Sequence, residues 1–466
     1  LPLLDKADPN ARLGPALKRA RAAAPGGLGE LRGQGALFGV DLRAPAGRSI
    51  TLDALVARGL GYPAAGWLLH RHAVRALPTV SAPATLRVEP SAAFADAERV
   101  EAAFTALGRV LEAGDVVELL APLLGEVDPT APAGRFQIAR DQPAPGAARA
   151  AFIHPLLAPE ALLIADHPRF AGVAPVRRQA LITFLEALLD HGPIPTFSRN
   201  LFGGRVWLRG IALAATPATM ARHHRAGAVE TLRRQVQAAV DRAAAEGCTV
   251  IALGGHASVV TAAGTSVLPP PGAHITTGNA LTAATVLHRL SPRLGRVGLL
   301  GPGNLGLALA RALAPRADSL LVVGRADPPP GLSALGATYH RDPRALADCD
   351  VIVTASNASA PVLRAEHFDI DQKVMIYDMA LPPAVDPALP RARPNIRLRR
   401  AGAVRLPQDL DFSPAPVLRP GRCFACAAEA ALLALAPYDG SLVGPLHAEA
   451  IAALDQRARR FGLFRD

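Results

Sequence analysis

The chain has 466 residues, of which 50% are hydrophobic, so it is long enough for two or three domains with their own cores. Four cysteines argue against a disulfide scaffold and fit the reducing cytoplasm, and no run of about 18 residues is apolar enough for a membrane span. The net charge of +11 comes almost wholly from arginine, but only 4% of residues are aromatic, which argues against a nucleic-acid partner.

Residues 1–150 carry no chemical motif, and we interpret them as an N-terminal extension or an extra α/β module of unknown role. Stretches rich in proline and glycine at 24–35 and 141–147 are typical of linkers. Between them, residues 37–42 resemble a strand, and residues 94–113 and 115–124 have helical spacing.

Residues 151–290 are predicted to form a second α/β domain that binds substrate. A strand over 205–212 is followed by Thr216-Pro217, a typical helix start, and the helix is expected to run on to Gly247. A buried strand over 248–253 then ends in a glycine pair followed by His256, and a polar segment at 276–279 leads into a helix over 280–290. Cys248 is expected to be an inert core thiol.

Residues 291–415 are predicted to form an NADP-binding Rossmann domain. A strand over 297–300, the loop Gly301-Pro-Gly303-Asn-Leu-Gly306 and a helix over 307–314 have the order that binds a dinucleotide. Gly301 allows a tight turn, Gly303 lets the backbone approach a pyrophosphate, and Gly306 lets helix and strand pack closely. The helix start would then attract the anion. The alternative is that these glycines serve packing alone.

The second strand of this domain, at 319–323, is followed by Gly324-Arg325 where an NAD site usually carries an acidic residue, which favours NADPH as the cofactor. Further strands are predicted at 338–340, 350–356, 373–379 and 396–400, and Cys349 is expected to be a core thiol. The predicted fold class is therefore α/β, with a Rossmann-type doubly wound parallel sheet, a second α/β substrate domain and an N-terminal extension. The cofactor-binding candidates are Gly301, Gly303, Asn304, Leu305, Gly306, Arg325, Ala355 and Ser356.

Residues 416–466 are predicted to be C-terminal helices that carry a candidate nucleophile. Cys423 and Cys426 would lie in the first turn of a helix over 421–435, where the helix dipole lowers the pKa of a thiol. Structural packing and nucleophilic catalysis remain open for both. No metal site is predicted, because a zinc site needs four ligands and no second cysteine or histidine pair has a suitable spacing.

Four segments resemble the long-chain acyl-[acyl-carrier-protein] reductases of the cyanobacterial, aldehyde-forming type, over roughly residues 150–466. They are Ala252-Leu-Gly-Gly255 with Ser258 nearby, Thr276-Thr-Gly-Asn279, the glycine loop at 301–306, and Phe424-Ala-Cys426-Ala-Ala-Glu429-Ala430. The resemblance implies NADPH-dependent reduction of a fatty acyl thioester, on acyl carrier protein or CoA, to the aldehyde. It also implies an acyl-enzyme on Cys426 and leaves Cys423 without a counterpart.

Chemistry of this kind needs groups that move protons and stabilise an oxyanion. His256, Ser258 and Glu429 are the further catalytic candidates. The alternatives are that His256 only hydrogen-bonds a loop and that Glu429 pairs with an arginine. Thr276, Thr277 and Asn279 are the candidates for positioning substrate or nicotinamide.

The segment after the fifth predicted strand, 379–383, lacks the basic residue that the family would have there. Two alternatives therefore stay open: an NADP-dependent dehydrogenase of a small hydroxy or amino acid without covalent catalysis, and a non-catalytic dinucleotide-binding component of a biosynthetic assembly. The sequence does not determine the acyl length, the carrier or the oligomeric state, and a homo-oligomer is one of the open alternatives.

Overall fold

The structure is a computed structural model that describes residues 10–34, 37–82, 84–89, 96–132, 134, 136–188, 190, 192–358, 360–406 and 414–464. Residue 35 of the first predicted linker, residues 94–95 of a predicted helix and residues 465–466 lie outside the described residues. The chain forms two compact units, one of residues 1–138 and 158–190 and the other of residues 139–157 and 191–466. The sequence division at about 150, 290 and 415 stays a prediction; the units differ from it in grouping 158–190 with the N-terminal part.

The first unit contains a four-stranded antiparallel sheet of β1 (Leu28–Gln34), β2 (Leu37–Leu42), β3 (Leu77–Pro78) and β4 (Thr85–Val88), in the order β1-β2-β4-β3. β2 is the strand predicted over 37–42. β1 covers most of the predicted linker at 24–35, so that interpretation is wrong. Its glycine-rich sequence becomes a strand because it pairs with β2, and local composition does not reveal such pairing.

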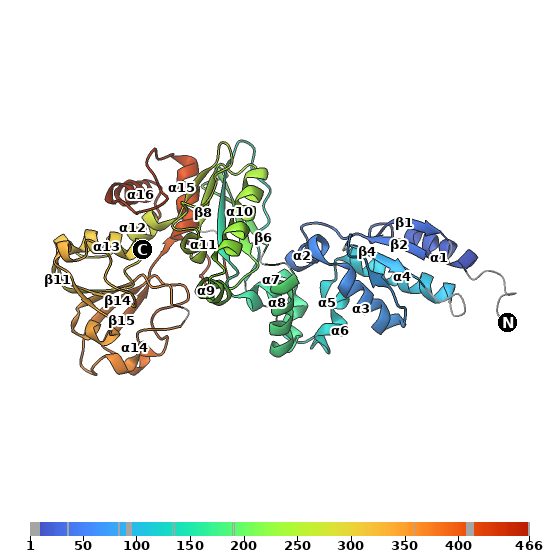
Figure 1. Cartoon of the computed structure of the whole chain (residues 1–466), viewed down its shortest axis with the longest axis horizontal. Helices are drawn as coiled ribbons and strands as arrows, with labels where there is room; N and C mark the ends of the chain where they lie inside the picture. The colour runs from blue at the N-terminus through green and yellow to red at the C-terminus, as the bar shows by residue number, and fades with distance from the viewer. Residues whose placement is uncertain are drawn as a thin grey trace. The chain divides into compact units, whose positions relative to one another are not determined.

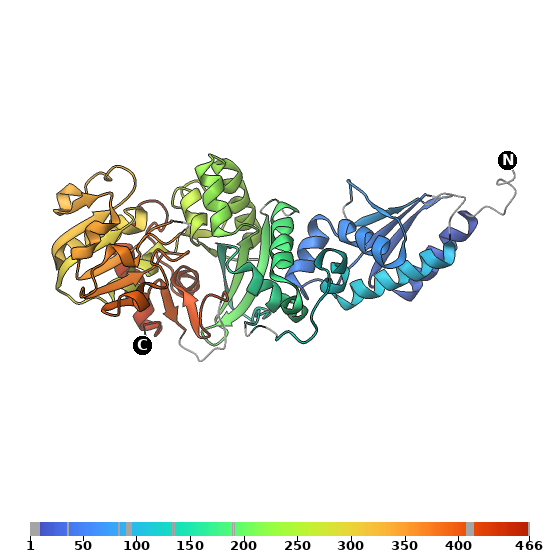
Figure 2. The ribbon, with the colours of Figure 1, turned by 90° about the horizontal axis from the view of Figure 1, so that it is seen from below.

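Helices α1 (Asn10–Ala23) and α4 (Ala97–Ala113) pack together on one face of this sheet (Figure 2). Asp96 caps α4 by accepting a hydrogen bond from the N–H of Arg99, and Gly114 ends the helix with φ +68°. The apolar face of α4 contributes Phe104 and Leu107, both fully buried, to the core. The other helices of this unit are α2 (Ile50–Arg58), α3 (Gly61–His72), α5 (Val116–Leu119), α6 (Ala121–Leu124), α7 (Pro159–Asp166), α8 (Pro175–Leu188) and the 3₁₀ turn Pro168–Gly172.

The second unit contains two sheets. The first consists of β5 (Ala148–Pro155), β6 (Pro193–Leu201), β7 (Val206–Leu213), β8 (Val250–Leu253) and β9 (His274–Thr276), in the order β6-β7-β5-β8-β9. All strands are parallel except β6. Along β5, Ile153 lies in the core with α10 (Val229–Ala245), and Phe152 lies against Phe424, with 6.0 Å between ring centroids. Helices α10 and α15 (Ala425–Leu435) thus cover opposite faces of this sheet (Figure 1).

The predicted helix start at Thr216 is confirmed, because its hydroxyl accepts a hydrogen bond from the N–H of Thr219 at the start of α9 (Pro217–Arg225). The helix does not continue to Gly247 unbroken. Residues 226–228 interrupt it, with Gly227 at φ +77°, and α10 begins afresh at Val229. Two short helices follow the strands of this sheet: α11 (His256–Val260) after β8 and α12 (Asn279–Leu287) after β9.

The second sheet is parallel and has the strand order of a dinucleotide-binding fold. It consists of β10 (Leu294–Leu300), β11 (Ala317–Val323), β12 (Thr338–His340), β13 (Val351–Thr354), β14 (Val374–Asp378) and β15 (Ile396–Arg400), ordered β12-β11-β10-β13-β14-β15. In order of sequence within this sheet, that is 3-2-1-4-5-6, the Rossmann order. The predicted α/β fold class is therefore confirmed.

Helix α13 (Asn304–Leu313) makes the first crossover of this sheet, and the later crossovers contain α14 (Leu389–Ala392) and 3₁₀ turns. The 3₁₀ turns are Ala314–Arg316, Ser333–Leu335, Pro343–Asp348 and Ala365–His367.

The C-terminal part contains the hairpin of β16 (Ala403–Arg405) and β17 (Arg422–Phe424), followed by α15 (Ala425–Leu435) and α16 (Ala448–Arg460). The prediction of a helix from residue 421 is wrong at its start, because residues 422–424 pair with β16. Small side chains along α15 let it pack closely on β5 and β8.

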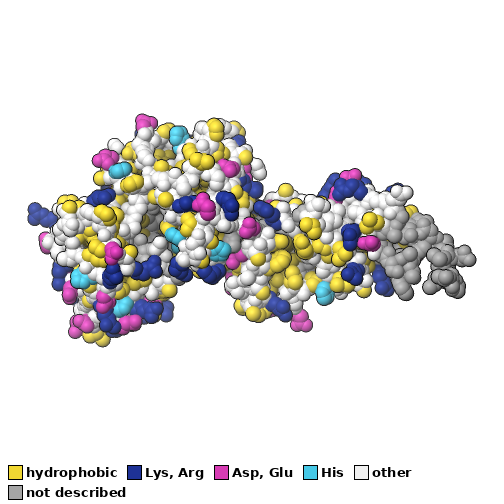
Figure 3. All heavy atoms as spheres, viewed as in Figure 1, with side chains coloured by type: hydrophobic (Ala, Val, Ile, Leu, Met, Phe, Trp, Pro, Cys, Tyr) yellow, Lys and Arg dark blue, Asp and Glu magenta, His cyan; other side chains and the backbone are white. Residues whose placement is uncertain are grey.

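None of the described helices is long and apolar enough to cross a membrane. The arginines that dominate the charge are spread over the visible face of the molecule and mixed with acidic side chains (Figure 3).

Candidate functional site

The glycine loop between β10 and α13 has the geometry that a bound pyrophosphate requires. Gly301 has φ +95°, and a Cβ there would lie 2.8 Å from the Cα of Ser356. A Cβ on Gly306 would lie 2.0 Å from the carbonyl oxygen of Gly301, so helix and loop are in direct contact. A Cβ on Gly303 would instead meet no described atom within 4 Å. The backbone is therefore open at the one glycine where a ligand must approach.

Asn304, predicted as a cofactor residue, binds the protein itself. Its side-chain amide donates to the carbonyl of Gly444 (2.8 Å) and accepts from the N–H of Leu446 (3.0 Å). The same C-terminal segment accepts a hydrogen bond from Thr277, whose N–H lies 3.2 Å from the carbonyl of Leu442. Asn304 and Thr277 are therefore fastened to one loop, and this role was not apparent from the sequence because the loop lies about 140 residues away.

The remaining cofactor candidates lie at the carboxyl ends of β11 and β13 and in the first turn of α13. Arg325 follows β11 and is exposed, as a residue that contacts a 2′-phosphate must be. Ala355 donates its N–H to the carbonyl of Leu300, and the hydroxyl of Ser356 accepts the N–H of Ala358. Leu305 is half-buried in the first turn of α13. Together with the open backbone at Gly303, these residues fit a dinucleotide.

Cys426 lies in the first turn of α15 and is half-buried. Across the fold it is in direct contact with Gly278, which has φ +69°. A Cβ on Gly278 would lie 2.1 Å from the Cβ of Cys426. Only glycine fits there, so the segment 276–279 and the Phe-Ala-Cys segment meet directly. Cys423 is separate: it lies in β17, is fully buried, and does not share the helix turn predicted for it.

Burial raises the pKa of the Cys426 thiol to about 12, and the charge of Glu429 acts in the same direction, while the N–H of Ala427 opposes both. Burial also raises the pKa of Cys423 above its usual range. The expectation that the helix start lowers these pKa values is therefore wrong, because the loss of solvent outweighs the helix end. Cys248 and Cys349 are buried core thiols as predicted, with pKa values raised to about 12 and 11.

Glu429, one turn after Cys426, is fully buried. The hydroxyl of Thr276 donates to one of its carboxyl oxygens, and the N–H of Leu281 donates to the other at 2.7 Å. Its partners are thus a hydroxyl and a backbone group rather than an arginine, and it caps the start of α12. Burial raises its pKa to about 7, although the N–H of Leu281 and the hydroxyl of Thr276 oppose this shift.

The other predicted residues lie in the two short helices that follow β8 and β9. Asn279 is the first residue of α12, directly after Gly278. His256 and Ser258 are buried in α11, beside α9. Burial lowers the pKa of His256, and the nearby charges of His224 and Arg225 lower it further, so it stays neutral at pH 7.

His154, at the end of β5, is a buried polar residue that is not among the candidates predicted from the sequence. Nδ1 lies 2.7 Å from the carbonyl oxygen of Pro155, which makes it the donor, and Nε2 lies 3.2 Å from the hydroxyl of Thr196. The ring stacks on Phe152, with centroids 4.8 Å apart. Burial lowers its pKa to about 4, so it is a neutral part of the core. The only sequence signal for His154 is its position before a proline at the end of a strand.

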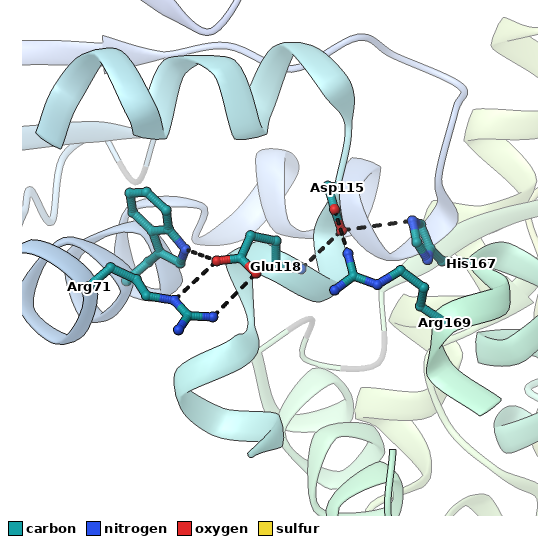
Figure 4. A network of polar contacts seen from close by, with 6 residues as sticks. Arg71, Asp115, Glu118, His167 and Arg169 are labelled. Carbon is teal, nitrogen blue, oxygen red and sulfur yellow. Dashed lines mark hydrogen bonds and ion pairs between the residues drawn. The ribbon is translucent and has the colours of Figure 1, made fainter. Parts of the chain in front are cut away.

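A separate polar cluster lies in the first unit (Figure 4). Glu118 accepts hydrogen bonds from Arg71 and from the indole of Trp67, each 3.1 Å long, and Asp115 accepts from Arg169 at 2.6 Å. These pairs connect α3, α5 and the turn after α7. They adjoin a cavity of about 470 Å³ lined by His70, Arg71, Val117, Glu118, Ala121, Pro122, Gly125, Glu126, Val127 and Arg169. The described residues contain no group of acidic, histidine and cysteine side chains that could hold a metal ion.

Neither a protein-family model nor a curated protein matches the chain. Among solved structures, it is similar to glutamyl-tRNA reductase from Methanopyrus kandleri, with 24% identity over 37% of this chain and 46% of the other, and a TM-score of 0.23. It is also similar to the A chain of dipicolinate synthase from Bacillus subtilis, with 15% identity over 37% and 60%, and a TM-score of 0.24.

A D-isomer specific 2-hydroxyacid dehydrogenase from Xanthobacter autotrophicus Py2, in complex with NADPH and MES, shares 20% identity over 27% of this chain and 66% of the other, with a TM-score of 0.21. The chain thus spans less than two thirds of the length of the first two structures. At such identities and TM-scores these likenesses decide nothing about function. The assignment of the fold rests on the strand order.

Proposed function

We propose that the protein is an NADPH-dependent reductase that converts an acyl thioester, carried on acyl carrier protein or CoA, to an aldehyde through an acyl-enzyme on Cys426. One observation carries this proposal: Cys426 touches the backbone of Gly278 at the loop after β9. The N–H of the preceding Ala425 binds the carbonyl of Gly402 at 2.9 Å, just beyond β15. Cys426 is thus connected both to the loop after β9 and to the segment just beyond β15. A Rossmann fold binds its ligands at the carboxyl ends of its strands, and this supports Cys426 as the nucleophile of the proposed reaction.

The residues around the glycine loop would hold the cofactor. The open backbone at Gly303 would face the pyrophosphate, and Arg325 favours a 2′-phosphate. Bound there, NADPH supplies the hydride for the reduction. Asn304 contributes indirectly, because its two hydrogen bonds keep α13 attached to the loop that also holds Thr277.

In the first step, the sulfur of Cys426 attacks the carbonyl carbon of the thioester. The bond between that carbon and the carrier sulfur breaks, and the carrier leaves as a thiol with the proton that Cys426 loses. After reduction of the acyl carbon, the bond to Cys426 breaks, the aldehyde departs, and the released thiolate takes up a proton from solvent.

The raised pKa of Cys426 means that it holds its proton at pH 7, so a base must take that proton during the attack. His256, neutral at pH 7, is our candidate for this base. Ser258, Thr277 and Asn279 are our candidates for positioning the substrate and the oxyanion. Glu429 is better suited to holding α12 than to proton transfer, since both its oxygens already accept hydrogen bonds.

The test is intact-protein mass spectrometry after mixing the protein with acyl-CoA or acyl carrier protein in the absence of NADPH. We expect an acyl adduct on the unaltered protein and on Cys423→Ala, none on Cys426→Ala, and discharge of the adduct as aldehyde when NADPH is added. Alcohol as the main product would contradict a reaction that ends at the aldehyde.

A second candidate is an NADP-dependent dehydrogenase of a small hydroxy or amino acid, and the raised pKa of Cys426 favours it because such chemistry needs no thiolate. The absence of any adduct, together with NADP⁺ reduction by a hydroxy or amino acid in Cys426→Ala, would establish this function. Tight cofactor binding without turnover would indicate a non-catalytic component.

A further inference from the structure

A cation lies at the edge of the dinucleotide sheet nearest to the nucleophile. Asp378, at the end of β14, is fully buried and accepts hydrogen bonds from the hydroxyl of Thr354 (2.6 Å) and the N–H of Ala380 (3.1 Å). Its other carboxyl oxygen pairs with the guanidinium of Arg400, the last residue of β15. A buried carboxylate thus fixes the direction of the arginine.

The guanidinium of Arg400 has more N–H donors than it uses in its two contacts with the protein. Nη1 binds Asp378 and Nη2 donates to the carbonyl of Ala380 at 2.8 Å, whereas a guanidinium carries five N–H groups in a rigid plane. The Arg400 side chain is 46% exposed, while that of Asp378 is 0% exposed. One edge of the group is therefore anchored to the protein and the rest is presented to solvent, an arrangement suited to binding an anion.

Arg400 lies close to the nucleophile in the fold. Two residues further on, Gly402 accepts the N–H of Ala425, which precedes Cys426. Gly402 has φ +75°, and its N–H donates to the hydroxyl of Thr285 on α12 at 3.2 Å. The end of β15 is thus held against both helices that surround Cys426.

Arg400 also brings a basic residue to the segment 379–383, which follows β14. The segment 379–383 contains none, but Arg400 binds the carbonyl of Ala380 within it. A cation from the next strand therefore serves this segment. The local sequence does not reveal this contact, because Arg400 lies 17 residues beyond the end of that segment.

The cofactor phosphates are too far away to be the anion. The glycine loop follows β10, and β15 is the third strand from β10 in the sheet order. Neighbouring strands lie about 4.8 Å apart, so the two strand ends are roughly 14 Å apart. Arg325, the candidate for a 2′-phosphate, follows β11 on the far side of β10. An anion bound at Arg400 would therefore belong to another molecule.

We propose that Arg400, held by Asp378, forms an anion-binding subsite beside Cys426 that recognises a phosphate or carboxylate on the thioester substrate. This proposal rests on the proposed function, since it concerns the same site. The anion has two sources, the phosphates of the CoA or pantetheine arm and a carboxylate at the end of the acyl group.

The test measures the rate at which three thioesters acylate Cys426 without NADPH, by intact-protein mass spectrometry. Hexanoyl-CoA carries phosphates, the N-acetylcysteamine thioester of adipic acid carries a carboxylate, and hexanoyl-N-acetylcysteamine carries neither. In Arg400→Gln we expect acylation by one of the two anionic donors to slow at least tenfold, the loss typical of a charge-assisted contact. The neutral donor should stay within twofold, and the donor affected identifies the source.

Arg399→Gln is the matched control, because Arg399 is exposed on the same strand, and it should leave all three rates unchanged. Since Arg400→Gln leaves Asp378 buried without its cation, the double variant Asp378→Asn/Arg400→Gln removes both charges together and should reproduce the selective loss. Equal slowing with all three donors, or no slowing with any, overturns the subsite.

Calorimetric binding of free CoA and adipate separates this proposal from the proposed function. If no thioester acylates Cys426, the proposed function fails. Weaker binding of either anion to Arg400→Gln than to Arg399→Gln would still support the subsite, whereas equal binding to both variants would overturn it as well.

Discussion

Replacing the buried Glu429 by glutamine should remove a pH dependence of stability. The pKa of this carboxyl is raised from 4.5 to about 7 in the folded protein, mainly by burial. The folded chain therefore holds a proton that the unfolded chain loses between these values. It follows that the free energy of unfolding falls as the pH rises through this window. Each pKa unit is worth about 1.4 kcal/mol, so the full effect is roughly 3 kcal/mol between pH 4.5 and 7.

Glutamine resembles the protonated carboxyl, because it can still accept from the N–H of Leu281 and bind the hydroxyl of Thr276. We expect Glu429→Gln to match the unaltered protein within about 1 kcal/mol at pH 5 and to be more stable by roughly 2–3 kcal/mol at pH 8. Urea unfolding at several pH values, followed by tryptophan fluorescence, measures this difference. Trp67→Phe in both proteins leaves Trp207 as the reporter of the second unit.

Glu449→Gln, an exposed carboxylate on α16, is the control for the loss of a negative charge and should follow the unaltered protein at every pH. If Glu429→Gln and the unaltered protein give parallel curves from pH 5 to 8, the reasoning from burial is refuted. If the free energy of unfolding of the unaltered protein instead rises with pH relative to that of the variant, the fold stabilises the carboxylate form of Glu429.

Four further substitutions test the two units. Gly278→Ala should lower the free energy of unfolding by about 2–4 kcal/mol and slow the alkylation of Cys426, because its Cβ would lie 2.1 Å from that of Cys426 at a φ of +69°. Thermal unfolding and alkylation rates measure these two effects, and an unchanged melting temperature would contradict the prediction. Gly306→Ala should destabilise the second unit by more than 1 kcal/mol. Gly303→Ala should leave the stability of this unit within about 0.5 kcal/mol of that of the unaltered protein but weaken NADPH binding. Equal unfolding midpoints for the two variants would refute this contrast. Glu118→Ala should destabilise the first unit by about 1–3 kcal/mol, because it leaves an indole and a guanidinium without their acceptor; limited proteolysis that cleaves this unit no faster would count against it.

The sequence by itself determined the dinucleotide sheet almost completely. The strands predicted at 338–340 and 396–400 coincide with β12 and β15, and the others agree within a few residues. This part is readable because parallel strands buried on both faces are short apolar runs, and because the glycines of the phosphate loop are fixed by local backbone requirements. The burial of Cys248 and Cys349 followed from the same pattern.

The tertiary structure alone decided how the site is put together. Cys426 meets Gly278, Glu429 meets Thr276, and Arg400 meets Asp378, and these partners lie between 22 and 153 residues apart. No local periodicity encodes such pairs. The thiol pKa shows the same limit: position at a helix start predicts a lower value, and burial, which only the packed fold creates, reverses its direction. Local backbone preferences thus fixed the elements of this protein, while desolvation and long-range contacts decided which side chains meet at the candidate site.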